Sequence, residues 1–175
     1  MENLQININH VWVMVAACMV FFMQLGFTSY EAGFSQSKNA ISISIRNLVE
    51  FLVSSLMFYV VGFGFMFGMS HMGWIGSNHF FASGVTSHPV NLAYTFFFYQ
   101  LVFAATASTI VSGAIAERSS FIPNVIGPAF MVGVIYPIFG HWAWGNLFYP
   151  EQAGWLGRLG FIDFAGSTVV HSIGG

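Results

Sequence analysis

Charged residues are scarce in this sequence. Of its 175 residues, 6% are Asp, Glu, Lys or Arg, whereas a soluble globular domain carries about 25%. Hydrophobic residues make up 56% of the chain, and Phe alone occurs 21 times. So little polar surface cannot cover a globule in water, and lipid is therefore the expected solvent for most of the chain.

Basic residues and cysteine are also few. The four Lys and Arg residues leave a formal net charge of −2, which lacks the cationic footprint that nucleic-acid binding needs. The single cysteine, Cys18, lies inside an apolar run. One cysteine supplies neither a disulfide framework nor a cysteine-based metal site. The sequence therefore excludes nucleic acid as a partner, and it predicts no bound metal.

Long apolar runs are what the sequence does have. A membrane-spanning helix needs about 20 mostly apolar residues, and these runs are too long and too uniformly apolar for barrel strands. We therefore predict an all-α fold, a polytopic transmembrane helical bundle. Because Gly175 falls inside an expected span, we also expect the chain to be part of a longer protein. The expected spans are residues 11–30, 48–69, 92–116, 121–144 and 161–175, the last of them cut short.

The basic residues predict how these spans are oriented. Lys38 and Arg46 follow the first span and Arg118 follows the third, whereas Arg158 follows the fourth. Basic connectors favour the cytoplasmic side of a membrane. We therefore expect the first and third connectors (31–47 and 117–120) in the cytoplasm and the N-terminus outside. No eukaryotic targeting segment is evident, which favours a bacterial cytoplasmic (inner) membrane.

The segment from Asp163 to His171, DFAGSTVVH, places two ionisable residues at a span. Asp163 precedes an apolar run, a position typical of a helix N-cap. In a continuous helix, His171 would lie about 12 Å deeper, close to the bilayer midplane. An ionisable residue at that depth usually serves a pathway, but a His that hydrogen-bonds a neighbouring helix could occupy the same place. Depth alone does not separate these two interpretations.

The same segment resembles the signature of the ammonium transporter, methylammonium permease and Rhesus protein family. Three further segments resemble, in the same order, the first cytoplasmic loop, the third helix with its following loop, and the end of the fourth helix of that family: AGFSQSKNAISISIRN, FYQLVFAATASTIVSGAIAERSSF and PIFGHWAWG. The resemblance covers most of residues 20–175. It implies the first inverted repeat, about five spans, of an eleven-helix transporter fold.

The resemblance implies passage of ammonium, or of ammonia with a separately handled proton, and no enzymatic activity. Phe103 and Trp144 correspond to the external cation site, where an aromatic face attracts a cation by about 0.5–2 kcal/mol. Tyr99 and Phe103, one helical turn apart, correspond to two stacked rings that gate the pore. The family usually has Phe at both gate positions, so Tyr99 is a departure from its pattern.

The resemblance also assigns the two ionisable residues. Asp163 corresponds to an acid with a structural and electrostatic role at the cation site, and His171 to one of two mid-pore histidines that donate and accept hydrogen bonds. The family is trimeric and needs no cofactor, so we expect a homotrimer in lipid. The neighbourhood of Glu31, Asn39 and Asn47 resembles members fused to signalling domains. A fused signalling domain or a cytoplasmic regulatory protein is therefore a possible partner.

Three alternatives stay open at this point. The first is a non-transporting ammonium sensor on the same scaffold. The second is a haem-bearing cytochrome that uses His141 and His171 as axial ligands. The third is an intramembrane hydrolase built on Asp163, Ser167 and His171, although a spacing of four residues is too long for direct contacts in a catalytic triad.

Two further patterns are assigned to packing. His141 is expected to hydrogen-bond at a helix end and not to bind a ligand. The glycines at 62, 64 and 68 lack the strand-then-helix context of a phosphate loop, and small residues let membrane helices approach closely. We therefore expect these three glycines at close helix contacts.

Overall fold

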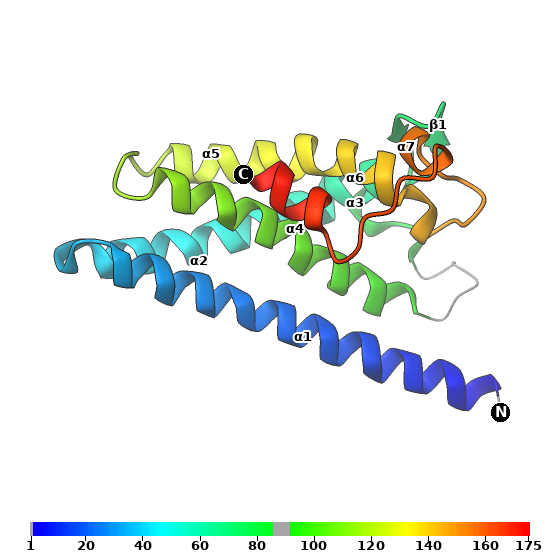
Figure 1. Ribbon diagram of the computed structural model, residues 1–175, viewed down its shortest axis with the longest axis horizontal. Coiled ribbons are helices and arrows are strands. Elements are labelled where there is room, and N and C mark those ends of the chain that lie inside the picture. The colour runs from blue at the N-terminus through cyan, green and yellow to red at the C-terminus, as the bar shows by residue number, and fades with distance from the viewer. Residues whose placement is uncertain (1, 86–91) are drawn as a thin grey trace.

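The computed structural model describes residues 2–85 and 92–175, and it is built almost wholly of helices (Figure 1). The main helices are α1 (Glu2–Phe34), α2 (Ala40–Met57), α3 (Phe63–Phe67), α4 (Ala93–Ile115), α5 (Pro123–Phe130), α6 (Tyr136–Trp144) and α7 (Trp155–Arg158). Three π-helical segments are η2 (Phe58–Gly62), η5 (Met131–Ile135) and η7 (Ser167–Ser172). Short 3-10 turns are η1 (Ser37–Asn39), η3 (Phe80–Ala82) and η6 (Gly145–Leu147), and β1 (Ser70–His71) pairs antiparallel with β2 (Ile75–Gly76).

The predicted class, an all-α polytopic membrane bundle, is confirmed. In the described part of the chain, four helical segments are long and apolar enough to cross a membrane: Asn3–Phe34, Ser37–Phe67, Ala93–Ile115 and Pro123–Leu147. The α1–α2 and α4–α5 turns lie at one end of the bundle, and the loops after α3 and α6 lie at the other (Figure 1). This is the pairing that the basic residues predict, while the side that faces the cytoplasm stays a prediction.

Helix boundaries differ from the expectation in two places. The expected connector 31–47 is mostly helical, because α1 continues to Phe34 and α2 begins at Ala40. Glu31 does not end the first helix, since its carboxyl group is buried and is hydrogen-bonded to a hydroxyl of α4. The fifth helix begins at Ser167 and not at Phe161, because the residues between them form an irregular turn.

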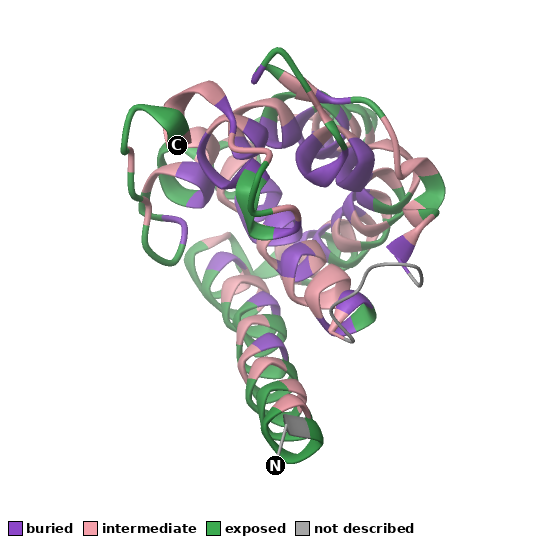
Figure 2. Ribbon diagram, turned by 90° about the vertical axis from the view of Figure 1, so that its right-hand side faces the viewer, coloured by how far each residue is buried: buried purple, intermediate pink, exposed green. Residues whose placement is uncertain are grey.

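Polar pairs join α1 to α4. The Nδ1 atom of His10 lies 2.9 Å from Oγ1 of Thr95. Further along, the amide of Gln24 donates to Thr106 (3.3 Å) and accepts from Thr109 (2.9 Å). Much of the rest of α1 is exposed, although Ala17 and Glu31 are buried, and its N-terminal end extends beyond the other helices (Figure 2). Because lipid is as apolar as a leucine side chain, such hydrogen bonds contribute to helix association where hydrophobic burial cannot.

The α2–η2–α3 helix approaches the α5–η5–α6 helix closely where both are π-helical. A Cβ atom added to Gly62 would lie 2.8 Å from the carbonyl oxygen of Val132. The prediction that this glycine permits close helix packing is therefore confirmed. Gly64 and Gly68 instead face the carbonyl oxygen of Asn78, at 2.7 Å from each added Cβ, so they admit the loop after α3 and not a second helix.

Hydrogen bonds tie the α1–α2 turn to the α4–α5 turn. The Oε1 atom of Glu117 accepts from the backbone N–H of Gln36 and from the side-chain amide of Asn39, both at 2.8 Å. The guanidinium of Arg46 donates to the carbonyl oxygen of Ser119 at 3.0 Å. Long-range contacts between two turns fix the relative positions of the helices that they join.

Acid is expected to weaken this link between the turns. The hydrogen bonds from Asn39 and Gln36, with the charge of Lys38, lower the pKa of Glu117 below its ordinary value of 4.5. A depressed folded pKa gives a contribution to stability that is complete above pH 4.5 and is lost as pH falls through the lowered pKa. We expect Glu117→Gln in the full-length protein to lower the unfolding temperature slightly at neutral pH and not at all below that pKa. Thermal unfolding across pH checks this, with the exposed Glu151→Gln as control, and a pH-independent difference would contradict it.

Candidate functional site

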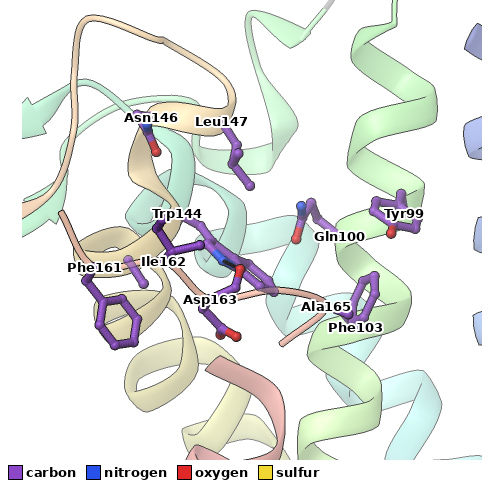
Figure 3. A pocket seen from close by; sticks show the side chains of 11 residues that line it. Tyr99, Gln100, Phe103, Trp144, Asn146, Leu147, Phe161, Ile162, Asp163 and Ala165 are labelled. Atoms are coloured by element: carbon purple, nitrogen blue, oxygen red, sulfur yellow. Dashed lines mark hydrogen bonds between the residues drawn. The ribbon is translucent and has the colours of Figure 1, made fainter. Parts of the chain in front are cut away.

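A cavity of about 290 Å³ opens beside the loop that follows α6 (Figure 3). One wall is α4, which contributes Tyr99, Gln100 and Phe103. The opposite wall is Trp144 at the end of α6 together with the irregular segment 161–165. The cavity therefore lies between segments that are about 40 residues or more apart in the sequence, and aromatic side chains supply much of its lining.

Three aromatic rings follow one another along this cavity. The ring centroids of Tyr99 and Phe103 are 4.9 Å apart with an interplanar angle of 85°, and those of Phe103 and Trp144 are 6.2 Å apart at 79°. Tyr99 and Phe103 lie one turn apart on α4, but the expected parallel stack is absent because the rings meet edge to face. This arrangement places the positive edge of one ring on the negative face of the next, which aromatic pairs prefer.

Trp144 is held in place at both ends of its side chain. It is the last residue of α6, and its indole N–H donates to the main-chain carbonyl oxygen of Asp163 at 3.2 Å. A Cβ atom added to Gly166 would lie 3.4 Å from the far edge of the indole. The ring is therefore fixed against the turn before η7, and its remaining surface faces the cavity (Figure 3).

Asp163 organises the start of η7. Its carboxylate accepts from the hydroxyl of Ser167 at 2.7 Å and from the backbone N–H groups of Val169 at 2.8 Å and Thr168 at 3.3 Å. The carboxylate thus has the expected capping function, although the helix begins at Ser167, three residues later than an N-cap at Asp163 would place it. The chain turns there through Gly166 at φ 81°, a left-handed conformation that favours glycine.

His171 lies on η7 and outside the cavity. Its side chain is exposed, and within the described residues it has no hydrogen-bond partner. The continuous helix from Asp163 on which the depth of 12 Å was based is absent, because only the part from Ser167 onward is helical; the depth of His171 stays a prediction. The structure therefore brings Tyr99, Phe103, Trp144 and Asp163 together and leaves His171 apart from them.

Gln100 is a cavity residue that the sequence did not single out. It is 3% exposed and lines the cavity, and its carbonyl oxygen Oε1 has no hydrogen-bond partner among the described residues. A buried unpaired carbonyl oxygen is costly unless a donor reaches it. The only sequence signal is a single amide between two aromatic residues in an apolar span, FYQLVF.

Both ring nitrogens of His141 are engaged in hydrogen bonds. The residue is fully buried, with Nδ1 at 2.8 Å from the carbonyl oxygen of Met66 and Nε2 at 2.9 Å from Oγ of Ser70. Since a carbonyl only accepts, Nδ1 carries the proton and Nε2 accepts from the hydroxyl. The expected hydrogen-bonding role is confirmed. Neither nitrogen is left for haem iron, which argues against the cytochrome alternative.

The hydrolase alternative also fails on geometry. Asp163 and Ser167 are in direct contact, contrary to the estimate from helical spacing, because the residues between them form a turn. The hydroxyl therefore donates to the carboxylate, whereas a triad needs a His between them. His171 has no hydrogen bond to either residue in the described part of the chain.

Comparison with known proteins relates this chain to one family. Residues 11–175 match the Ammonium Transporter Family. Ammonium transporter Amt2 of Archaeoglobus fulgidus is 44% identical over 184 residues, which cover 99% of this chain and 37% of that protein. Ammonium transporter 1 member 3 of Solanum lycopersicum is 40% identical over 171 residues, covering 97% and 36%. The chain thus spans about a third of the length of these curated relatives.

Solved structures give the same result. A structure described as Sensor Amt Protein is 72% identical with a TM-score of 0.97, and the match covers 99% of this chain and 43% of that one. The structure of Candida albicans Mep2 is 28% identical with a TM-score of 0.80, and the match covers 93% of this chain and 35% of that one. The helical arrangement described above is therefore shared with both proteins.

Proposed function

Because the chain belongs to the ammonium transporter family, we propose that it forms the outer, ammonium-recruiting part of a channel or transporter for ammonium. The supporting observation is the cavity lined by Tyr99, Phe103, Trp144 and Gln100, whose buried side-chain oxygen has no hydrogen-bond partner among the described residues. The chain is a multi-pass membrane protein. For the intact protein we propose a homotrimer in the cytoplasmic membrane, with the N-terminus outside.

Recruitment requires that the cavity replace the water around an ammonium ion. The faces of Trp144 and Phe103 attract a cation, by about 0.5–1 kcal/mol at exposed sites and about 2 kcal/mol or more where water is excluded. The Oε1 atom of Gln100 supplies an acceptor for one N–H of the ion, which would satisfy a buried carbonyl oxygen. Asp163 contributes indirectly, since its backbone carbonyl holds the indole and its negative charge favours a cation nearby.

Beyond the cavity, the ammonium ion can no longer travel as a bare cation. A bare cation is expensive in the hydrocarbon interior. We propose that Tyr99 and Phe103 restrict the way inward and that His171 then hydrogen-bonds the nitrogen as it passes, neutral or with its proton handled separately. An imidazole suits this task because one ring nitrogen donates and the other accepts. The exposed ring of His171 leaves room for a partner from a later helix.

The recruitment step predicts a loss of affinity when the indole is removed. Trp144→Leu in the full-length protein is expected to raise the half-saturating ammonium concentration by about 2- to 30-fold, which corresponds to about 0.5–2 kcal/mol of cation–π attraction. The measurement is the ammonium-induced current on a solid-supported membrane, with binding calorimetry alongside. Trp155→Leu is the matched control, because that indole lies at the same end of the bundle and does not line the cavity. Equal affinity in wild type and Trp144→Leu would contradict the assignment.

A second candidate function is ammonium sensing. The likeness to the protein described as Sensor Amt Protein, at 72% identity, is the observation that favours it. In this alternative, ammonium occupies the same cavity without being conducted, and the occupied state acts on a fused signalling domain or a cytoplasmic regulatory protein. Saturable ammonium binding without current in the full-length protein would establish sensing, whereas a saturable current would establish transport.

A further inference from the structure

Two carboxyl groups lie inside the bundle, away from the cavity beside Trp144. Glu31 of α1 is 8% exposed, and Glu50 of α2 is 1% exposed. Both belong to segments that can cross a membrane, and Glu50 lies about 15 Å along the helix from Ala40. Each carboxyl has polar side chains within hydrogen-bonding reach: Asn47 and Ser112 for Glu31, and Ser108 and Ser112 for Glu50. Glu31 is also close enough for its negative charge to repel that of Glu50. None of these groups carries a positive charge, so the pair has no counter-ion in the part of the chain that the structure describes.

Ser112 of α4 lies between the two carboxyls. Its Oγ atom is 3.2 Å from Oε1 of Glu31 and 2.9 Å from the carbonyl oxygen of Thr109. The same hydroxyl is also within hydrogen-bonding reach of the carboxyl of Glu50. A serine hydroxyl has only one hydrogen to donate. When that hydrogen is given to Thr109, the contact between Ser112 and Glu31 is a hydrogen bond only if the carboxyl of Glu31 carries a proton.

Other buried polar atoms around Glu50 are unpaired. Oε1 of Glu50, Oγ of Ser108 and Nδ2 of Asn47 have no well-aligned hydrogen-bond partner among the described residues, although Ser108 is within reach of the carboxyl of Glu50 and Asn47 within reach of that of Glu31. Ser108 is 1% exposed and Asn47 is 7% exposed. Buried polar groups in proteins are nearly always satisfied. These side chains supply N–H and O–H donors but no positive charge, so among the described residues nothing near the pair offsets a second negative charge.

Glu31 also connects the pair with the outside of the bundle. It lines a second cavity, of about 400 Å³, between α1 and α4 beside the turns. The charged groups at its mouth, Glu117 and Arg118, are hydrogen-bonded to the α1–α2 turn and to the carbonyl oxygen of Ala114 respectively. Arg46 of α2 donates to the α4–α5 turn. No basic side chain in the described residues therefore neutralises the pair.

We propose that Glu31, Ser112 and Glu50 form a proton-binding site that holds one proton between the two carboxyls. Glu31 takes the proton from water in the second cavity. As Glu31 passes its proton to Oγ of Ser112, the hydrogen of Ser112 passes to Glu50, so one proton moves inward and Ser112 is unchanged. The site stands on these contacts alone and does not depend on what occupies the cavity beside Trp144.

Infrared difference spectroscopy of the full-length protein tests this site. The wild type is expected to show the C=O stretch of a protonated carboxyl at neutral pH and to lose it in alkali. Glu50→Gln should weaken or remove this band at neutral pH, because it removes the more deeply buried of the two carboxyls. Ser112→Ala should shift the pH at which the band disappears. Glu117→Gln, which removes an exposed acid from the same end of the bundle, is the matched control and should keep the band.

Two outcomes would overturn the proposal. One is a wild type without the band, or a band unchanged in both Glu50→Gln and Glu31→Gln. The other is a band that sodium, potassium or ammonium chloride removes at fixed pH in wild type, since a cation would then be the occupant. Should Glu50→Gln fail to fold, Glu31→Gln and Ser112→Ala carry the same test. Trp144→Leu should leave the band in place, so failure of the recruitment proposal is distinguishable from failure of this one.

Discussion

Replacement of His171 by Ala in the full-length protein is expected to abolish or reroute the ammonium-induced current and to leave the fold nearly intact. The expectation for folding follows from the structure, because the ring is exposed and has no hydrogen bond to the described residues. The expectation for conduction follows from the proposed relay. Without an imidazole, a nitrogen that has left the aromatic cavity meets no donor and acceptor pair, and a bare cation in lipid is unfavourable.

The measurement is the current on a solid-supported membrane, wild type beside His171→Ala, with ammonium and potassium compared for selectivity. Ser172→Ala is the matched control, since that residue is the exposed neighbour on η7 and its hydroxyl only donates to the carbonyl oxygen of Ser167. Wild-type flux and selectivity in the His171 variant would refute the relay. An absent current in a wild type that folds and binds ammonium would favour sensing.

The sequence was sufficient to predict the helical spans, because a membrane requires long apolar runs and these can be counted. It was less able to predict where the helices end. The expected first span ends at residue 30, before Glu31, but the structure keeps this carboxyl inside the bundle, where a hydroxyl from α4 is hydrogen-bonded to it. That partner is 81 residues away in the chain, so no local pattern indicates it. The π-helical segments η2 and η5 were likewise not predicted.

The candidate site was predicted in part, because some of its residues can be recognised in the sequence and others only from their burial in the structure. The family resemblance selected Tyr99, Phe103 and Trp144, and the structure brings them to one cavity. It did not select Gln100, because an amide becomes informative only when its oxygen is known to be buried and unpaired. The roles of all of these residues in ammonium binding and passage remain predictions.

Asp163→Ala is expected to lower both the stability of the protein and its affinity for ammonium. The carboxylate accepts three hydrogen bonds at the start of η7, and loss of a capping side chain costs about 0.5–2 kcal/mol. Because the backbone carbonyl of the same residue holds the indole of Trp144, a loosened turn would also displace one wall of the cavity. Thermal unfolding and ammonium titration of the full-length protein measure the two effects.

Asp163→Asn separates a structural role from direct contact with the ion. An asparagine keeps one oxygen that can accept from Val169 or Ser167 but has no negative charge. If Asp163 acts by holding the turn, Asn should recover most of the stability and most of the affinity that Ala loses. If the carboxylate touches ammonium, Asn should recover stability without affinity. Because three hydrogen bonds already occupy the carboxylate, we expect the first result. Any affinity that Asp163→Asn does not recover would then measure the contribution of the negative charge of Asp163.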